Sequence, residues 1–456
     1  MQHDVFGQPT SLELAGSCAD WNAAMLGFLA HAAVTPQHLM SVLAAEPGFA
    51  LGHAVKGMFY LLLGRRELVA VAETDLAAAQ RAMAEGHVLP REALYVQALQ
   101  VWLQGRPSQA VQLLEQVLRA DPADALAMKL SHAIRFVLGD ATGMRRSVER
   151  VLPAYGPDHP GHGYLLGCHA FALEETGDYD RAEIAGRQAL WTAPDDAWGL
   201  HAVAHVHDMT GNARKGLDWL AGRETAWAHC NNFRYHVWWH KALMHLDQGQ
   251  IDAVLDLYDT AIRADKTDDY RDISNATSLL TRLELEGVDV GDRWVELADL
   301  SAARTEDGCL VFADLHYLLA LGADNRPAEL GRLLQRMHRD ARAGETEMAE
   351  RMARPGLQAA QGLEAFGEGQ YGTAFVHLSQ ARTTLQKAGG SHAQRDVFER
   401  LTIDAGLRAG LLDQAEAILD QRRDQRAGAE DAFAAARREI IAIGRNESGA
   451  QSVPAQ

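Results

Sequence analysis

The sequence predicts an all-α fold, a solenoid of about ten helix pairs. Glycines typical of helix ends recur along the chain, and from Gly105 to Gly322 their spacings are 34, 38, 34, 38, 38 and 35 residues. This period matches a two-helix repeat unit. Long runs of alternating β-branched residues, which would indicate strands, are scarce. Each unit is therefore expected to bury its apolar face against its neighbours.

Two consecutive units carry the finer pattern of a known repeat. Gly177-Asp-Tyr-Asp-Arg-Ala182 leads to Ala189-Leu190 and then to Pro194, and Gly105-Arg-Pro-Ser-Gln-Ala110 leads in the same way to Val117 and Pro122. Glycine allows the turn, small residues let paired helices touch, and proline closes the second helix. These residues resemble the tetratricopeptide repeat, and the fold class that we predict is a tetratricopeptide-type helical-repeat solenoid.

The chain is expected to divide into four parts along this array. Residues 1–88 are predicted to form irregular N-terminal helical repeats, and residues 89–265 the central tetratricopeptide repeats with a histidine and tryptophan cluster. Residues 266–445 are predicted to form C-terminal helical repeats and a cap, including a capping helix from Ala427 to Ile443. Residues 446–456 are expected to be a disordered tail.

Composition narrows the functional classes. Of 456 residues, 43 are Lys or Arg and 61 are Asp or Glu, giving a net charge of −18. This charge argues against a nucleic-acid partner. The four cysteines are far apart and typical of reduced thiols in a cytosolic protein. Neither a membrane span nor a signal peptide is evident, so we expect a soluble cytoplasmic protein.

Two polar stripes are the most informative local feature. His201 and His205 are spaced i, i+4 with Asp208 one turn on, and in the next helical segment His236 and His240 repeat the spacing, followed by Asp247. Residues at this spacing share one face of a helix. In tetratricopeptide repeats, positions 2, 5, 6, 9, 12 and 13 of the first helix line the inner groove, and the repeat register assigns both stripes to such positions. We therefore expect both stripes to face one inner pocket.

The predicted site residues fall into two sets. The acid–base candidates are His201, His205, Asp208, His236 and His240, because an imidazole beside a carboxylate suits proton transfer near neutral pH. The ligand-binding candidates, which would enclose a planar or apolar molecule or face the same surface, are Trp198, Trp239, Phe171, Glu174 and His316.

Three interpretations of the stripes compete. The histidines could simply pack in an inter-repeat core. They could bind a metal, with His201, His205, His236 and His240 around zinc and Asp208 or Glu174 behind them. They could instead line a metal-free and cofactor-free small-molecule pocket in which hydrolysis or proton transfer takes place. We favour the pocket and keep zinc as the alternative.

The runner-up function is a peptide- or protein-binding scaffold without catalysis. Tetratricopeptide grooves that clamp peptide carboxylates are rich in Lys and Arg, whereas Lys129 is an isolated basic candidate here. Arg395 and Asp396 are candidates for anchoring the C-terminal units against the middle of the superhelix. A superhelix closed on itself in this way would make the groove a chamber and favour a small ligand. The capping helices also leave a homo-oligomer among the expected assemblies.

Three segments narrow the family resemblance. They are Asp196-Ala-Trp198-Gly-Leu-His201-Ala-Val-Ala-His205, His236-Val-Trp238-Trp239-His240, and Gly389-Gly-Ser-His-Ala-Gln-Arg395. In this order they resemble the tetratricopeptide repeat protein 38 family over nearly the whole chain. The resemblance implies an α-helical repeat fold and brings no established activity, so function must come from the residues.

Overall fold

The computed structural model describes residues 2–86 and 88–451, with side chains to residue 446. The described chain is a tetratricopeptide-type array of sequential helix pairs, which confirms the predicted fold class. A two-stranded antiparallel hairpin, β1 (Gln2–His3) with β2 (Pro9–Thr10), precedes it. The first helices are α1 (Ala15–Leu29), α2 (Thr35–Ala45), α3 (Ala50–Leu62) and α4 (Arg66–Ala84).

The central helices carry both histidine pairs. They are α5 (Pro90–Leu103), α6 (Pro107–Ala120), α7 (Ala125–Val137), α8 (Ala141–Val151), the short turn η1 (Leu152–Ala154), α9 (His162–Glu174), α10 (Tyr179–Thr192), α11 (Ala197–Met209), α12 (Ala213–Leu220), α13 (Thr225–Ala228), α14 (Phe233–Asp247), α15 (Ile251–Leu257) and η2 (Tyr258–Ile262).

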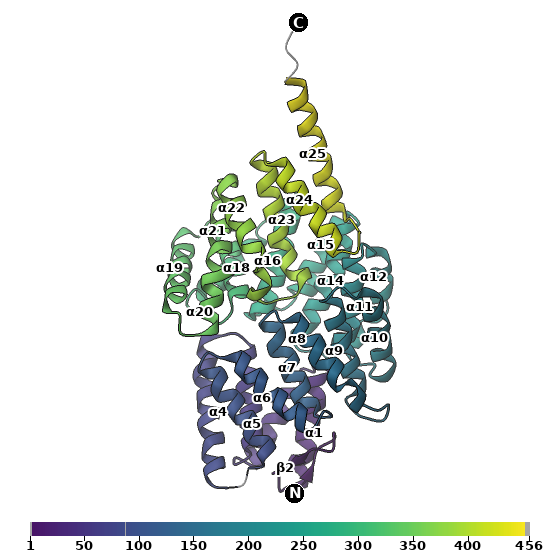
Figure 1. Ribbon diagram of the computed structural model, residues 1–456, viewed down its shortest axis with the longest axis vertical. Helices are drawn as coiled ribbons and strands as arrows, with labels where there is room; N and C mark the ends of the chain where they lie inside the picture. Colours follow the sequence, from purple (N-terminus) through teal and green to yellow (C-terminus); the bar gives the residue numbers. More distant parts are fainter. Residues whose placement is uncertain (1, 87, 452–456) are drawn as a thin grey trace.

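The C-terminal helices complete the array. They are α16 (Tyr270–Leu285), α17 (Arg293–Ala303), α18 (Val311–Ala323), α19 (Pro327–Ala343), α20 (Glu347–Arg351), η3 (Met352–Gly356), α21 (Leu357–Gly367), α22 (Tyr371–Arg382), η4 (Leu385–Ala388), α23 (His392–Arg408), α24 (Leu412–Gln425) and α25 (Ala432–Gln451). Figure 1 shows the N-terminal helices in the lower half, the C-terminal helices in the upper half, and α25 projecting from the upper end.

The glycine period marks the turns with one exception. The repeat glycines with positive φ, from 61° to 80°, are Gly64, Gly105, Gly139, Gly177, Gly211, Gly249, Gly287, Gly369 and Gly410. Gly322 instead lies inside α18, and Asn325, with φ of 52°, is the left-handed residue of that turn. Asparagine tolerates this conformation because its side chain can bond locally.

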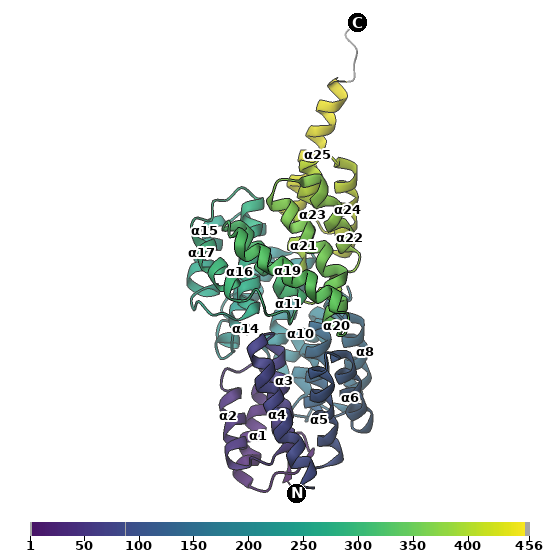
Figure 2. The same ribbon diagram turned by 90° about the vertical axis from the view of Figure 1, so that its left-hand side faces the viewer.

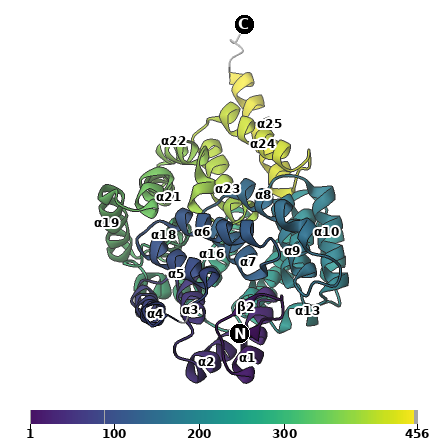
Figure 3. The same ribbon diagram turned by 60° about the horizontal axis from the view of Figure 1, so that its bottom comes forward.

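The array closes on itself. The backbone N–H of Glu347 donates to the Gly105 carbonyl at 3.0 Å, joining the start of α20 to the turn between α5 and α6. Arg351 donates to the Leu138 carbonyl at 2.7 Å, and Tyr179 donates to the Gln425 carbonyl at 2.7 Å. Helix α23 packs against both α11 and α16. Figure 2 shows α20 above the N-terminal helices, and Figure 3 shows the same array from below.

The residues that were candidates for anchoring the C-terminal units do so. Arg395 lies 3.7 Å from the Glu175 carboxylate at the end of α9, and Asp396 accepts from Arg422 at 2.7 Å. Asp396 also lies 3.7 Å from the buried Arg282 of α16. Because Glu175 and Arg282 belong to other helix pairs than α23, the two ion pairs with them join distant parts of the array.

The C-terminal end differs from the expectation. The final helix begins at Ala432 rather than Ala427 and continues to Gln451, so residues 446–451 are helical and not a disordered tail. The remaining residues of the expected tail, 452–456, lie outside the described part of the chain. Across the described ranges, none of the helices combines the length and the apolar character that crossing a bilayer requires.

Candidate ligand-binding and histidine site

The two histidine pairs meet in the interior, between α11 and α14. His201 Nε2 lies 2.9 Å from His236 Nε2, which in turn lies 3.1 Å from His240 Nε2. The ring centroid of His205 lies 4.3 Å from that of His201 and 4.2 Å from that of His240. His201, His205 and His240 are at most 1% exposed and His236 is 9% exposed. The i, i+4 spacing on two packed helices thus brings four imidazoles together.

A chain of amides determines which nitrogen of His236 carries the proton. The backbone N–H of Ser391 donates to Gln394 Oε1 at 3.0 Å in the capping box of α23, so Gln394 Nε2 must be the donor to Asn275 Oδ1 at 2.9 Å. Asn275 Nδ2 is then the donor to His236 Nδ1 at 3.0 Å. Because His236 Nδ1 accepts, neutral His236 is protonated at Nε2. Its Nε2–H therefore points at the acceptor nitrogens of His201 and His240.

Burial keeps this cluster uncharged. Loss of hydration lowers the pKa of His236 to about 3 and holds the pKa values of His201 and His240 well below their usual range, and the neighbouring imidazoles lower them further. Protonating any of these close-packed rings would place a positive charge in an interior away from water, which is costly. Three neutral imidazoles are thus available as hydrogen-bond donors and acceptors at neutral pH.

Glu174 links the cluster to α23. Its Oε2 lies 3.4 Å from His205 Nδ1, while its Oε1 forms a very short hydrogen bond with His392 Nε2. Although burial opposes the charge, Glu174 raises the pKa of His392 to about 9, and the two histidines lower the pKa of Glu174 to about 2. The pair is therefore ionic at neutral pH and connects α9 to the first residue of α23.

A mainly apolar cavity of about 340 Å³ lies beside the histidines. His201 and His236 form part of its lining with Phe171 and Trp198, whereas His205 and His240 lie behind them. The lining draws residues from α1 to α3, from the central helices, and from the loop before α23. A volume of this size fits a small ligand.

The loop before α23 requires its two glycines. Gly389 and Gly390 have φ of 96° and 74°. A Cβ on Gly389 would lie 2.6 Å from the Val137 carbonyl oxygen, and one on Gly390 would lie 2.5 Å from the Phe312 ring. The Gly-Gly-Ser sequence thus lets this loop approach closely and form one wall of the cavity.

The structure also brings in residues that sequence reasoning did not single out as site residues. His31, in a left-handed conformation with φ of 58°, stacks on Trp198 at 5.3 Å and on Phe233 at 4.7 Å. His132 lines the same cavity and contacts Trp198 edge-on. A bulky non-glycine residue at positive φ often marks a functional position, but the sequence does not reveal its backbone angle.

The predicted residues separate into three groups. Phe171 and Trp198 line the cavity together with His201 and His236. Trp239 stacks on His236 with ring centroids 5.3 Å apart, which places it behind the cluster. His316 lies apart, where its Nδ1 donates to the Phe312 carbonyl at 2.7 Å and its ring contacts Phe398. Neither Trp239 nor His316 belongs to the cavity lining.

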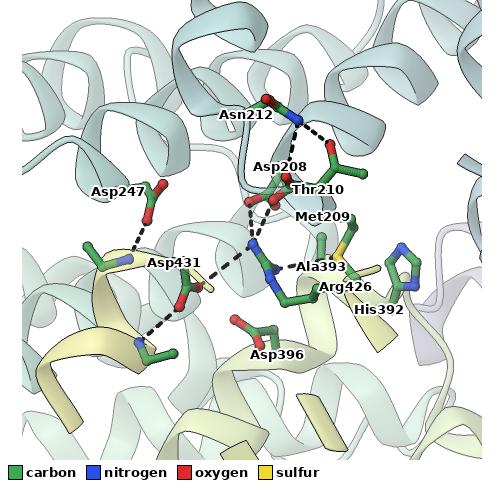
Figure 4. A network of polar contacts seen from close by, with 12 residues as sticks. Asp208, Met209, Thr210, Asn212, Asp247, His392, Ala393, Asp396, Arg426 and Asp431 are labelled. Carbon is green, nitrogen blue, oxygen red and sulfur yellow. Dashed lines mark hydrogen bonds and ion pairs between the residues drawn. The ribbon is translucent and has the colours of Figure 1, made fainter. Parts of the chain in front are cut away.

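Asp208 does not join the histidines, so its expected place in the pocket is wrong. Its carboxylate lies 3.8 Å from Arg426, which also donates to the Asp208 carbonyl at 2.6 Å (Figure 4). Asp247 likewise accepts from the backbone N–H of Ala432 at 2.8 Å. Both residues lie near the C-terminal ends of α11 and α14, where the carboxylates face the last helices of the chain.

One ring nitrogen from each of His201, His205, His236 and His240 lies within 4.8 Å of the others, close enough for one metal ion, although the hydrogen-bonded arrangement differs from four-coordinate zinc. Zinc bound by four imidazoles at about 2.0–2.1 Å would separate the ligand nitrogens by roughly 3.4 Å, whereas the two Nε2 separations at His236 are 2.9 and 3.1 Å. More importantly, a proton on His236 Nε2 leaves no lone pair for the metal. The nearby group of Glu174, Glu175, His205 and His392 contains an imidazolium, because His392 keeps its proton at neutral pH.

The fold and the site define a helical-repeat protein whose array closes on itself, with a cavity beside a buried histidine cluster. No protein-family model matches the chain. A solved structure described as the human IFIT1 dimer with PPP-AAAA is similar at a TM-score of 0.42 and 13% identity, over 94% of this chain and 95% of that chain. A likeness this remote says nothing about ligand or partner.

Proposed function

We propose that this protein binds a small, mainly apolar molecule in the cavity beside His201 and His236. The cavity itself carries the proposal: aromatic rings of Phe171, Trp198 and Phe233 line it, and a few polar groups converge on it. Ligand sites have this composition because apolar walls supply affinity and a few polar groups fix orientation.

A peptide-binding scaffold is the weaker candidate. A peptide would need an open inner groove, but α23 packs against α11 and α16, which occupies the space between central and C-terminal helices. The closing contacts of Glu347 and Arg351 further reduce access from the side. Closure supports a chamber for a small molecule.

Acid–base or hydrolytic catalysis on the bound molecule is the second candidate function. His236 would act as the hydrogen-bond donor and His201 as the acceptor, while Glu174 would orient His205 behind them. Neutral His201 keeps a ring lone pair that can accept a proton or a hydrogen bond from the bound molecule, although its lowered pKa makes it a weak base. Cleavage of 4-nitrophenyl butanoate by the wild type and not by His201→Gln would support catalysis; equal rates would contradict it.

We also propose membership of the tetratricopeptide repeat protein 38 family. The three segments that carry the resemblance meet around one site: His201 bonds to His236, and Glu174 contacts both His205 and His392. If the members of the family share this site, the three segments would be kept together because each contributes residues to it.

Binding can be tested by filling the cavity. Ala133→Phe adds a ring to the lining of the cavity and removes no polar contact. We expect decan-1-ol and 2-naphthylmethanol to raise the melting temperature of the wild type and not of this variant, because ligand binding stabilises the folded state. Ala77→Phe, at an exposed site on α4, is the matched control. Equal shifts for all three proteins would contradict binding in this cavity.

A further inference from the structure

We propose that the ligand carries a carboxylate or a similar anionic group, and that Lys129 binds this group. The inference rests on the proposed binding function and specifies the chemical class of the ligand. The argument begins from an unusual buried charge on α7.

Lys129 is 3% exposed and lines the cavity. Its Nζ donates to His31 Nε2 at 3.2 Å, lies 3.8 Å from Cys168 Sγ, and is 5.1 Å from the centroid of the Trp198 ring. Within the part of the chain that the structure describes, no carboxylate forms an ion pair with it. An ammonium group has three N–H donors, and a thiol is a weak acceptor. At least one strong donor remains for a ligand.

Asp196, which caps α11, is a group of opposite sign that interacts electrostatically with Lys129. Its Oδ2 accepts from the Gly199 N–H at 3.1 Å. Burial raises the pKa of this carboxyl to about 7 although Lys129 lowers it, so Asp196 is partly protonated at neutral pH. Asp196 therefore neutralises the ammonium only in part, and a buried charge without a full partner is costly.

The other cations of the lining already have partners. Lys56 pairs with Asp75 at 3.0 Å, and Arg271 makes two hydrogen bonds with the Asp269 carboxylate. Among the described residues that line the cavity, none is Asp or Glu. The unbalanced positive charge of the cavity is thus concentrated at Lys129, so an anionic ligand would complete the pairing.

Two neutral imidazoles flank the ammonium and can assist it. Because His31 Nε2 accepts from Lys129, neutral His31 carries its proton on Nδ1. His132, one turn after Lys129 on α7, is 3% exposed and lacks a hydrogen-bond partner at either ring nitrogen. Buried polar atoms without partners in a cavity wall are expected to face a ligand group. Trp198 stacks on His31 and would cover the apolar part of the ligand next to its anionic group.

Matched ligand pairs separate charge from apolar burial. We would measure dissociation constants of 2-naphthoate and 2-naphthylmethanol, and of decanoate and decan-1-ol, by calorimetry on the wild type, Lys129→Met and Lys266→Met. Each pair shares its apolar body and differs in charge. The expected result is at least about tenfold weaker carboxylate binding by Lys129→Met, with alcohol binding within about twofold of wild type, since a charge-assisted contact is lost. Lys266→Met, at an exposed lysine outside the cavity lining, should change neither.

Each outcome bears on one proposal. Carboxylate and alcohol binding that weaken equally, or carboxylate binding that Lys129→Met leaves intact, would overturn the anion site while the binding function stands. If neither the carboxylate nor the alcohol of either pair binds the wild type, both the anion site and the proposed binding function fail. Should Lys129→Met not fold, wild-type preference decides: an alcohol bound as tightly as its carboxylate overturns the inference.

Discussion

At the scale of single residues, the protonation of His236 distinguishes a hydrogen-bonded histidine cluster from a metal centre. The amide chain from Ser391 through Gln394 and Asn275 makes His236 Nδ1 an acceptor. Replacing Asn275 by Asp would put an acceptor opposite Nδ1, which moves the proton to Nδ1 and frees Nε2. Carboxylates behind metal-bound histidines work in this way.

We therefore predict that the wild type, loaded with zinc and desalted, retains substoichiometric metal, whereas Asn275→Asp retains more. Nitrogen-15 NMR of the imidazole should show His236 protonated at Nε2 in the wild type and at Nδ1 in the variant. Asn231→Asp, at another lining asparagine, controls for added charge. One equivalent of zinc on the wild type, with Nδ1 protonated, would contradict the assignment.

Residue spacing was sufficient to predict part of this site. The i, i+4 pairs and the repeat period predicted that four histidines share one inner space, because both follow from helix geometry. The angular position around the helix axis grouped Asp208 with His201 and His205. Asp208 lies farther along the axis, however, and its carboxylate faces Arg426 instead of the histidines. The sequence marks Lys129 as an isolated basic residue. Its partner His31 is 98 residues away, so only the closed superhelix reveals their contact.

At the scale of elements, the entry into α23 depends on the Gly389–Gly390 turn. The glycine period located the other turns without a structure, but the close approach of Gly390 to Phe312 is a contact between distant units. Sequence patterns specify local conformation better than such contacts, because packing between units depends on the curvature of the whole array.

A matched pair of substitutions measures this contact. Gly390 and Gly369 both have φ of 74°, but a Cβ on Gly369 would meet nothing within 4 Å. Gly369→Ala should cost about 1 kcal/mol in the free energy of unfolding for its backbone conformation. Gly390→Ala should cost roughly 1–3 kcal/mol more, because its Cβ overlaps the Phe312 ring. Urea unfolding monitored by circular dichroism measures both, and equal losses would contradict the packing argument.

At the scale of the whole molecule, contacts between distant helices close the repeat array on itself. The Glu174–His392 ion pair spans 218 residues and joins the central repeats to α23. Repeat arrays normally gain stability from nearest-neighbour units, so their stability is nearly additive. Closure adds contacts between distant units to the free energy of unfolding, and the contribution of the Glu174–His392 ion pair depends on pH.

The pH dependence follows from the sign of each shift. The pKa of His392 rises from 6.5 to about 9 on folding, so its contribution is complete below pH 6.5 and is lost as pH rises through 9. The pKa of Glu174 falls from 4.5 to about 2, so its contribution is complete above pH 4.5 and is lost as pH falls through 2. The ion pair is therefore most stabilising from pH 4.5 to 6.5.

We predict that the stability advantage of the wild type over His392→Gln shrinks between pH 6.5 and pH 9, through a loss on the order of 2 kcal/mol at His392. The buried histidines with lowered pKa values gain stability in both proteins as pH rises through 6.5, so the difference between the two profiles carries the prediction. His245→Gln, at a histidine bonded to Gln250 rather than to a carboxylate, should keep the wild-type slope. Parallel pH profiles for wild type and His392→Gln in differential scanning calorimetry would show that this pair does not hold the chamber closed.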